Sequence, residues 1–144
     1  MKRLLGCAPV FHVADVEVSV DFYCDKLGFE RPRIWGEPPF FATPKRDDMT
    51  IMLQRVDSED KIKPNNILDG NWDVYFWVRD AQELFEEFKS NNVPVESKPE
   101  RNHEQGSIEF TVIDPDGYHL VFAEEMADEH FIELVTSDPL KRLI

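Results

Sequence analysis

Val13-Ala14-Asp15 and Val78-Arg79-Asp80 each end an apolar stretch with an aspartate, and a helical pattern follows both. Aspartate is a favoured N-cap because its side chain accepts a hydrogen bond from a backbone N–H of the first helical turn. Glu83 follows Asp80 at the spacing of a capping box. The two aspartates are 65 positions apart in a chain of 144 residues. A repeat of nearly half the chain predicts two copies of one supersecondary unit.

Hydrophobic periodicity gives both halves the same order of elements. In the first half we expect a strand over 8–13, a helix over 16–26, and strands over 29–35, 40–43 and 49–55. In the second half we expect a strand over 72–78, a helix ending near 91, a short segment over 93–95, a charged loop over 96–105, and strands over 108–113 and 118–123. The predicted fold class is α+β, with two paired βαβββ modules forming curved mixed sheets around a cleft.

The length predicts a single domain made of two fused half-domains that share one core. We place the first module at about 7–56 and the second at about 71–125. A polar linker at about 57–70 contains Pro64-Asn65-Asn66 and separates them. Residues 126–144 form a C-terminal extension outside the repeat.

The formal net charge of −13 limits the classes of partner. Such an acidic surface repels nucleic-acid phosphates and anionic lipid, and it favours a small cationic ligand. No apolar run reaches the length needed to cross a bilayer, and the N-terminus lacks a convincing secretory signal. Cys7 and Cys24 have no metal-binding or redox spacing, so we expect free thiols in the cytoplasm.

Three segments together resemble the vicinal oxygen chelate superfamily, which includes glyoxalase I, extradiol dioxygenases and bleomycin-resistance proteins. They are the segment from Val13-Ala14-Asp15 to Leu27-Gly28-Phe29, the turn Arg46-Asp47-Asp48, and Ile113-Asp114-Pro115-Asp116-Gly117. The resemblance covers about residues 7–125. It implies paired βαβββ modules and, in the enzymes of the superfamily, a divalent metal held by His and Glu residues.

Transferring the four metal-ligand positions of the superfamily onto this chain gives Ala8, Met52, Asp73 and Val121. Three of these are apolar, whereas a first-row metal needs at least three good nitrogen, oxygen or sulfur donors. The resemblance therefore implies that the usual metal site is absent, and we expect neither a cofactor nor a catalytic residue. A relocated site formed by His12, His119 and Asp73 remains an alternative.

Alternation along the strands indicates what lines the cleft instead, because every second side chain lies on the same face of a sheet. Aromatic residues and a few polar groups recur at such positions, as expected of a pocket for a flat organic ligand. The face with Val74, Phe76 and Val78 is expected to pack on helices. The candidate ligand-binding residues are His12, Trp35, Phe41, Met52, Gln54, Asp73, Tyr75, Trp77 and His119.

The pattern is most similar to the bleomycin-resistance branch, which lacks the metal ligands and sequesters drugs. The resemblance implies a homodimer that binds an antibiotic, drug or metabolite without altering it. Where that branch has an aromatic residue that stacks on the drug, this chain has Gln105, and an extra residue follows Gly106. This departure argues against bleomycin as the ligand.

Three other functions stay open at this stage. The first is a metal-dependent lyase, isomerase or dioxygenase with the relocated site. The second is a metal-free enzyme in which His12 or His119 is the general base. The third is a regulatory or scaffold module that binds a protein through its acidic face or residues 124–144.

Overall fold

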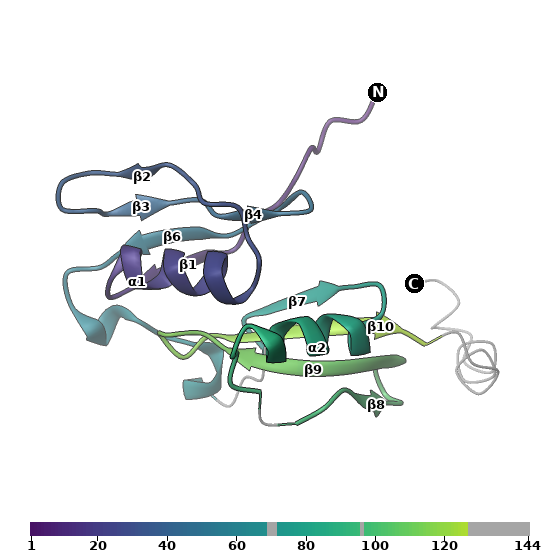
Figure 1. The fold of residues 1–144 in the computed structure, drawn as a ribbon. Helices are drawn as coiled ribbons and strands as arrows, with labels where there is room; N and C mark the ends of the chain where they lie inside the picture. The colour runs from purple at the N-terminus through teal and green to yellow at the C-terminus, as the bar shows by residue number, and fades with distance from the viewer. Residues whose placement is uncertain (69–71, 96, 127–144) are drawn as a thin grey trace.

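The computed structural model describes residues 1–68, 72–95 and 97–126 and shows two similar modules side by side (Figure 1). The first module's main sheet has the strand order β1-β6-β3-β2, and the second module's sheet has the order β7-β10-β9-β8. We call these the N-terminal sheet and the C-terminal sheet. In each, the first strand pairs in parallel with the last, and the other pairs are antiparallel. The predicted α+β class with two paired βαβββ modules is confirmed.

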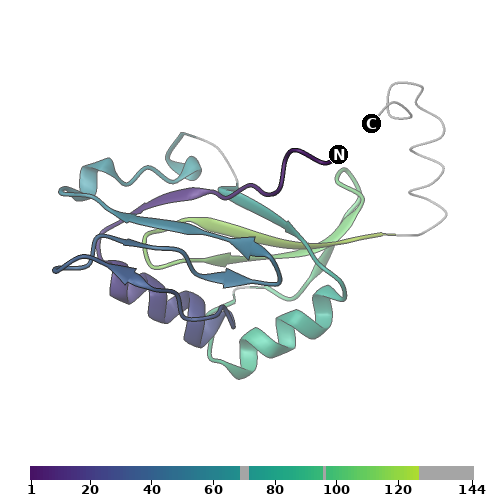
Figure 2. The ribbon, with the colours of Figure 1, turned by 90° about the horizontal axis from the view of Figure 1, so that it is seen from above.

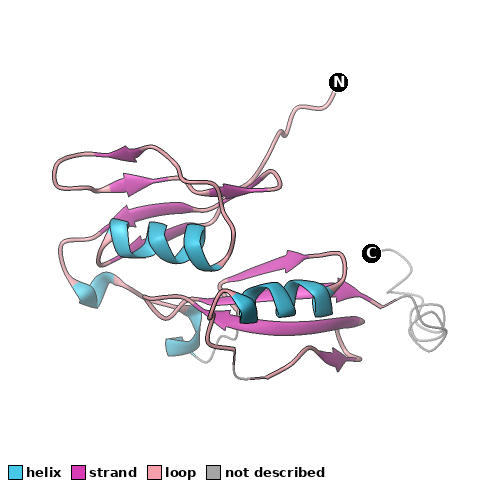
Figure 3. Ribbon diagram, in the orientation of Figure 1, coloured by secondary structure: helices cyan, strands magenta, loops and turns pink. Residues whose placement is uncertain are grey.

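Both modules begin with a strand and a helix, and further strands follow (Figure 3). The strands of the N-terminal sheet are β1 Val10–Val13, β2 Ile34–Trp35, β3 Phe41–Ala42 and β6 Met52–Arg55. The strands of the C-terminal sheet are β7 Val74–Trp77, β8 Glu100–Asn102, β9 Ser107–Ile113 and β10 His119–Glu125. A separate hairpin consists of β4 Lys45–Arg46 and β5 Met49–Thr50. The helices are α1 Val16–Asp21, α2 Ala81–Ser90 and the short 3-10 helices Glu59–Lys61 and Asn65–Leu68.

Both predicted aspartate caps are present. The Asp15 carboxylate accepts from the Val18 N–H at 3.1 Å, and the Asp80 carboxylate accepts from the Glu83 N–H at 3.0 Å. Helix α1 continues as a π-helix over Phe22–Lys26, so the predicted helix over 16–26 is helical throughout with two hydrogen-bond patterns. Gly28 follows it with a φ of +74°, a left-handed conformation that suits glycine and ends the helix.

Each helix covers one face of its own sheet, and both helices lie on the same side of the molecule (Figure 2). Val16, Val20 and Tyr23 from the first helix are fully buried against the N-terminal sheet. In the second module, Phe88 packs edge-on against Phe110 and Phe122 at 5.9 and 5.1 Å between ring centroids. We call the face of each sheet opposite its helix the outer face.

Three predicted elements differ from the structure. The strand expected over 49–55 is interrupted at Ile51, so that β5 belongs to the hairpin and β6 to the N-terminal sheet. The strand expected over 29–35 contains regular pairing only at Ile34–Trp35, and Glu30 forms an isolated bridge with Lys45. The charged loop expected over 96–105 contains strand β8, which pairs with β9. β8 is an edge strand, a place where charged residues are common because one side faces water. The charged residues of this segment therefore led to the prediction of a loop where a strand is present. The C-terminal extension lies almost wholly outside the described residues.

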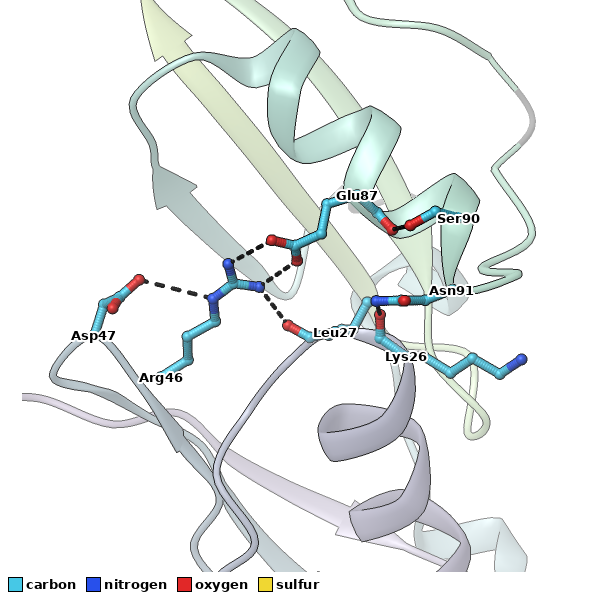
Figure 4. A network of polar contacts seen from close by, with 7 residues as sticks. All are labelled: Lys26, Leu27, Arg46, Asp47, Glu87, Ser90 and Asn91. Carbon is cyan, nitrogen blue, oxygen red and sulfur yellow. Dashed lines mark hydrogen bonds and ion pairs between the residues drawn. The ribbon is translucent and has the colours of Figure 1, made fainter.

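Two turns join the modules. Arg46, in the β4–β5 hairpin, donates to the Leu27 carbonyl at 2.7 Å and to both carboxylate oxygens of Glu87 on α2 at 2.7 and 3.0 Å (Figure 4). In the opposite direction, Asp116 accepts from the Ala14 N–H at 3.0 Å and from the Ser19 hydroxyl at 3.3 Å. Each module therefore holds the helix of the other.

Candidate functional site

The outer face of the N-terminal sheet carries five of the predicted ligand-binding residues. In the strand register, His12 lies opposite Gln54, Gln54 opposite Phe41, and Phe41 opposite Trp35. These four residues therefore form one row across the sheet. Met52 lies two positions before Gln54 and shares its face. The intervening residues Phe11, Val13, Ala42 and Leu53 point to the buried side.

The N-terminal row is open to solvent. His12 and Gln54 are exposed, Phe41 and Met52 are half-buried, and Trp35 retains 42% of its exposure. The guanidinium of Arg33 lies over the Trp35 ring at 3.7 Å from the centroid. A cation in this position is attracted by the electron-rich ring face. The strand alternation that identified Trp35 also places Arg33 two residues earlier, but the sequence interpretation did not include it.

The outer face of the C-terminal sheet carries a ladder of aromatic rings. Trp72 and Tyr75 have ring centroids 5.1 Å apart, and Tyr75 and Trp77 have centroids 5.0 Å apart. Trp77 is 76% exposed at the end of this ladder. Val121 and Ala123 lie opposite Tyr75 and Trp77 in the register and are fully buried. They provide an apolar base on which the rings stand.

Glu109 adds a carboxylate to this face that the sequence interpretation missed. It accepts hydrogen bonds from the Tyr75 hydroxyl at 2.9 Å, the Ser107 hydroxyl at 2.8 Å and the Asn102 side-chain amide at 3.2 Å. Burial raises the pKa of Tyr75, so the phenol remains a donor near neutral pH. Glu100 lies opposite Glu109 in the register. Glu109 and Ser107 lie on the same face of the C-terminal sheet as Ala123. This placement could be predicted only if the pairing of β9 with β10 were already known.

Asp73 has a structural role in the described part of the chain. One carboxylate oxygen accepts from the Asn65 N–H at 2.8 Å, and the other accepts from the His119 N–H at 2.8 Å. The side chain therefore ties the linker to the start of β10. His119, half-buried, begins β10 and shares the outer face with Val121. The nine predicted residues thus form two groups, one on each sheet.

The donor set does not fit a metal. Strand pairing gives Ala8 and Met52 the same relative positions in the first module that Asp73 and Val121 have in the second. Of these four side chains only Asp73 has an oxygen or nitrogen donor, and Met52 adds only a thioether sulfur. Within residues 1–68, 72–95 and 97–126, no three His, Cys, Asp or Glu side chains converge as a metal site. The relocated set of His12, His119 and Asp73 is therefore not assembled.

None of the helices in the described residues is long and apolar enough to cross a membrane. Comparison with family models gives a match over residues 8–122 to the Glyoxalase/Bleomycin resistance protein/Dioxygenase superfamily. The chain belongs to this superfamily. No curated protein matches the sequence.

Several solved structures share the fold. A member from Sphaerobacter thermophilus has a TM-score of 0.65 at 24% identity, covering 85% of this chain and 98% of that one. A protein from the mobile metagenome of V. Pseudocholerae has a TM-score of 0.61 at 24% identity, with coverages of 86% and 96%. A bleomycin-binding protein from Streptomyces verticillus, complexed with copper(II)-bleomycin, has a TM-score of 0.57 at 24% identity, with coverages of 89% and 100%. At these identities the likeness establishes the fold alone.

Proposed function

We propose that this protein is a non-catalytic binding protein that sequesters a small organic molecule, an antibiotic, drug or metabolite, on the outer faces of its sheets. One observation carries the proposal. The outer faces present rows of aromatic side chains with a few polar groups, and the superfamily's metal-ligand positions hold Ala8, Met52, Asp73 and Val121. Such surfaces bind by stacking and burial and have no assembled metal centre for chemistry.

Stacking supplies the affinity in this proposal. A good aromatic contact with a flat ring contributes about 1–3 kcal/mol by analogy with base stacking. Trp77 and Trp35 each present an exposed indole for such a contact. Two contacts together with charge attraction would bring the dissociation constant to the micromolar range, which corresponds to about −8 kcal/mol.

The charge of the outer faces supports a cationic ligand. Glu100, Glu109 and Glu125 belong to the outer face of the C-terminal sheet by register, and the whole chain has a net charge of −13. A negative field attracts and orients a cation. On the outer face of the N-terminal sheet, the Arg33 guanidinium lies over the Trp35 ring, and this contact supports an indole as a partner for a cation. The bleomycin-binding relative supports a drug-like ligand class.

A homodimer is part of the proposal. Val10, Trp35 and Trp77 are exposed to 52%, 42% and 76%, and exposed apolar residues grouped on sheet faces commonly mark interfaces or ligand grooves. A second copy would cover part of each outer face and close the binding surface. We place this binding in the cytoplasm, where the free thiols Cys7 and Cys24 would remain reduced.

The test is a titration of the full chain with flat organic cations, such as quinoxaline-type and glycopeptide drugs, in excess chelator. Tryptophan fluorescence and calorimetry would measure binding, and mass spectrometry would examine the recovered ligand. Trp77→Ala and Trp35→Ala should each weaken binding by about tenfold, the loss of one stacking contact. Ile67→Ala is the matched control because Ile67 is 57% exposed outside both rows.

Unchanged affinity in both tryptophan variants would contradict the proposed site. A chemically altered ligand would contradict sequestration and favour an enzyme. Sedimentation of the free protein addresses the dimer separately, and a monomer at all concentrations would exclude it.

A further inference from the structure

A hollow lies between the modules and is lined by residues of both. It has a volume of about 360 Å³ and is lined from the first module by residues that include Phe29 and Met49. From the second module it is lined by Phe76, Leu84 and Phe122, among others. Phe76 alternates with Tyr75 and Trp77 and points to the helix side of the C-terminal sheet. The hollow therefore lies on the helix side of the C-terminal sheet, and it shares one lining residue, Trp77, with the proposed ligand surface.

The floor of this junction pocket is aromatic. Phe76 stacks on Phe122 with ring centroids 5.0 Å apart and planes 14° from parallel. Phe88 from α2 meets the edge of Phe122 at 5.1 Å. Met49, 51% exposed on the β4–β5 hairpin, lies on the other side of the hollow. A pocket of this size is at the lower end of the range for small-molecule sites, about 300–1,000 Å³.

The charges at the rim select the ligand. Arg46 is already engaged by Glu87, the Leu27 carbonyl and, at 3.7 Å, the Asp47 carboxylate. Arg79 also lines the pocket, is exposed, and has no hydrogen-bond or ion-pair partner among the described residues. In a chain with 29 acidic and 16 basic residues, the one unengaged charge lining this hollow in the described structure is therefore positive.

The neighbouring helix terminus does not supply the anion site. The Ala81 N–H at the start of α2 already donates to the Glu124 carboxylate at 2.8 Å, and the Glu83 N–H donates to Asp80. The Arg79 guanidinium is thus the available donor. Its planar fork suits a carboxylate or sulfonate, which can accept two parallel hydrogen bonds.

We propose that the junction pocket binds a small amphiphilic anion, with a carboxylate or sulfonate at Arg79 and an aromatic or short aliphatic body over Phe76 and Phe122. Burial of the apolar body supplies affinity in proportion to the area removed from water. The charge-assisted hydrogen bonds at Arg79 set the orientation. This site shares Trp77 with the outer faces but selects the opposite charge through Arg79, so its test does not depend on the proposed function.

The experiment uses 8-anilinonaphthalene-1-sulfonate, an aromatic sulfonate whose emission rises on transfer to an apolar site, with the full chain. Octanoate should displace this probe at a lower concentration than 1-octanol, which has the same chain length without the charge. Arg79→Glu should weaken probe binding by about tenfold or more, the usual effect of losing a hydrogen bond to a charged group. Arg79→Lys keeps the charge but loses the planar fork, so its affinity should lie between those of the wild type and Arg79→Glu.

Two further variants locate the probe. Met49→Trp adds bulk at the pocket and should abolish saturable binding, whereas Trp35→Ala changes only the outer face and should leave the binding unchanged. Thermal unfolding of each variant verifies that it folds. Any one of three results would overturn the proposal. They are wild-type affinity in Arg79→Glu, equal displacement by octanoate and 1-octanol, and loss of binding in Trp35→Ala.

Discussion

The turn 45–48 and the turn 114–117 occupy corresponding places, since each precedes the last strand of its module's main sheet. Both reach the helix of the other module, but they do so with different chemistry. The first uses Arg46 against Glu87, with side-chain exposures of 27% and 41%. The second uses Asp114, of which only 4% is exposed, and the Tyr23 hydroxyl donates to it at 2.7 Å. The same topology thus produces one ionic clamp in partial contact with water and one buried clamp.

The difference shows how burial decides the strength of a contact. Water screens a partly exposed ion pair, so its net contribution is small although three short hydrogen bonds are present. Asp114 is buried, so water cannot replace its protein partners. Its carboxylate also accepts from the N–H groups of Asp116 and Tyr118, both at 2.9 Å. Removing a buried acceptor leaves its donors without partners, which is costly. We therefore expect the buried turn to dominate the association of the modules.

The largest expected effect is that of Asp114→Ala. It should lower the free energy of unfolding by about 3–5 kcal/mol, since three donors lose their acceptor and each unsatisfied buried group costs about 1–3 kcal/mol. Urea unfolding followed by far-UV circular dichroism would measure it. Asp47→Asn is the control in the other turn, because the Asp47 side chain is 91% exposed and asparagine tolerates its φ of +47°. Equal losses in the two variants would contradict the difference between the turns.

A smaller effect should appear in the pH dependence of stability. Burial raises the pKa of Asp114 to about 6 in the folded protein, against 3.8 for an unperturbed carboxyl. Between these values the folded state binds a proton that the unfolded state has released, so this group makes stability fall as pH rises from about 4 to about 6. The fall should reach about 1–3 kcal/mol.

Asp114→Asn removes the titrating group while retaining an oxygen acceptor. Unfolding free energies of the wild type and this variant, measured at intervals from pH 4 to pH 7, should therefore differ by a pH-dependent amount. A constant difference across the range would show that Asp114 does not titrate there.

The smallest effect concerns the exposed clamp. A double-mutant cycle of Arg46→Gln and Glu87→Gln should give a coupling free energy of about 0.5–1 kcal/mol, as for other partly exposed ion pairs. The coupling should decrease between 0.05 and 0.5 M salt, because the Debye length shortens over that range. A coupling free energy above about 2 kcal/mol that does not change with salt would contradict the expected difference between the exposed and the buried turn.

The elements with strong local chemistry could be predicted. Asp15 and Asp80 cap their helices as expected, and alternation assigned Phe76 and Tyr75 to opposite faces of β7. These features depend on residues a few positions apart, whose geometry is set by the backbone. Strand β8 could not be recognised, since its three residues pair only with β9 and lack an apolar pattern.

The candidate site was predictable only in part for the same reason. Trp35, Phe41 and Gln54 became one row through the pairing of β2, β3 and β6, which local sequence does not specify. Glu109 joins the second group because β9 pairs with β10 beside Tyr75. Asp73, predicted as a ligand-binding residue, instead has both oxygens engaged by backbone amides of distant residues.

The sequence alone determined the repeat, the capped helices and the alternation of faces, because these follow from interactions between neighbours along the chain. The resemblance also predicts that apolar side chains occupy three of the four positions that hold metal ligands in enzymes of the superfamily. The tertiary structure decided which acids are buried, which cations are engaged and where the modules enclose a hollow. Those properties depend on groups far apart in sequence, such as Tyr23 with Asp114 and Arg46 with Glu87. Their proximity exists only after both modules have folded against each other.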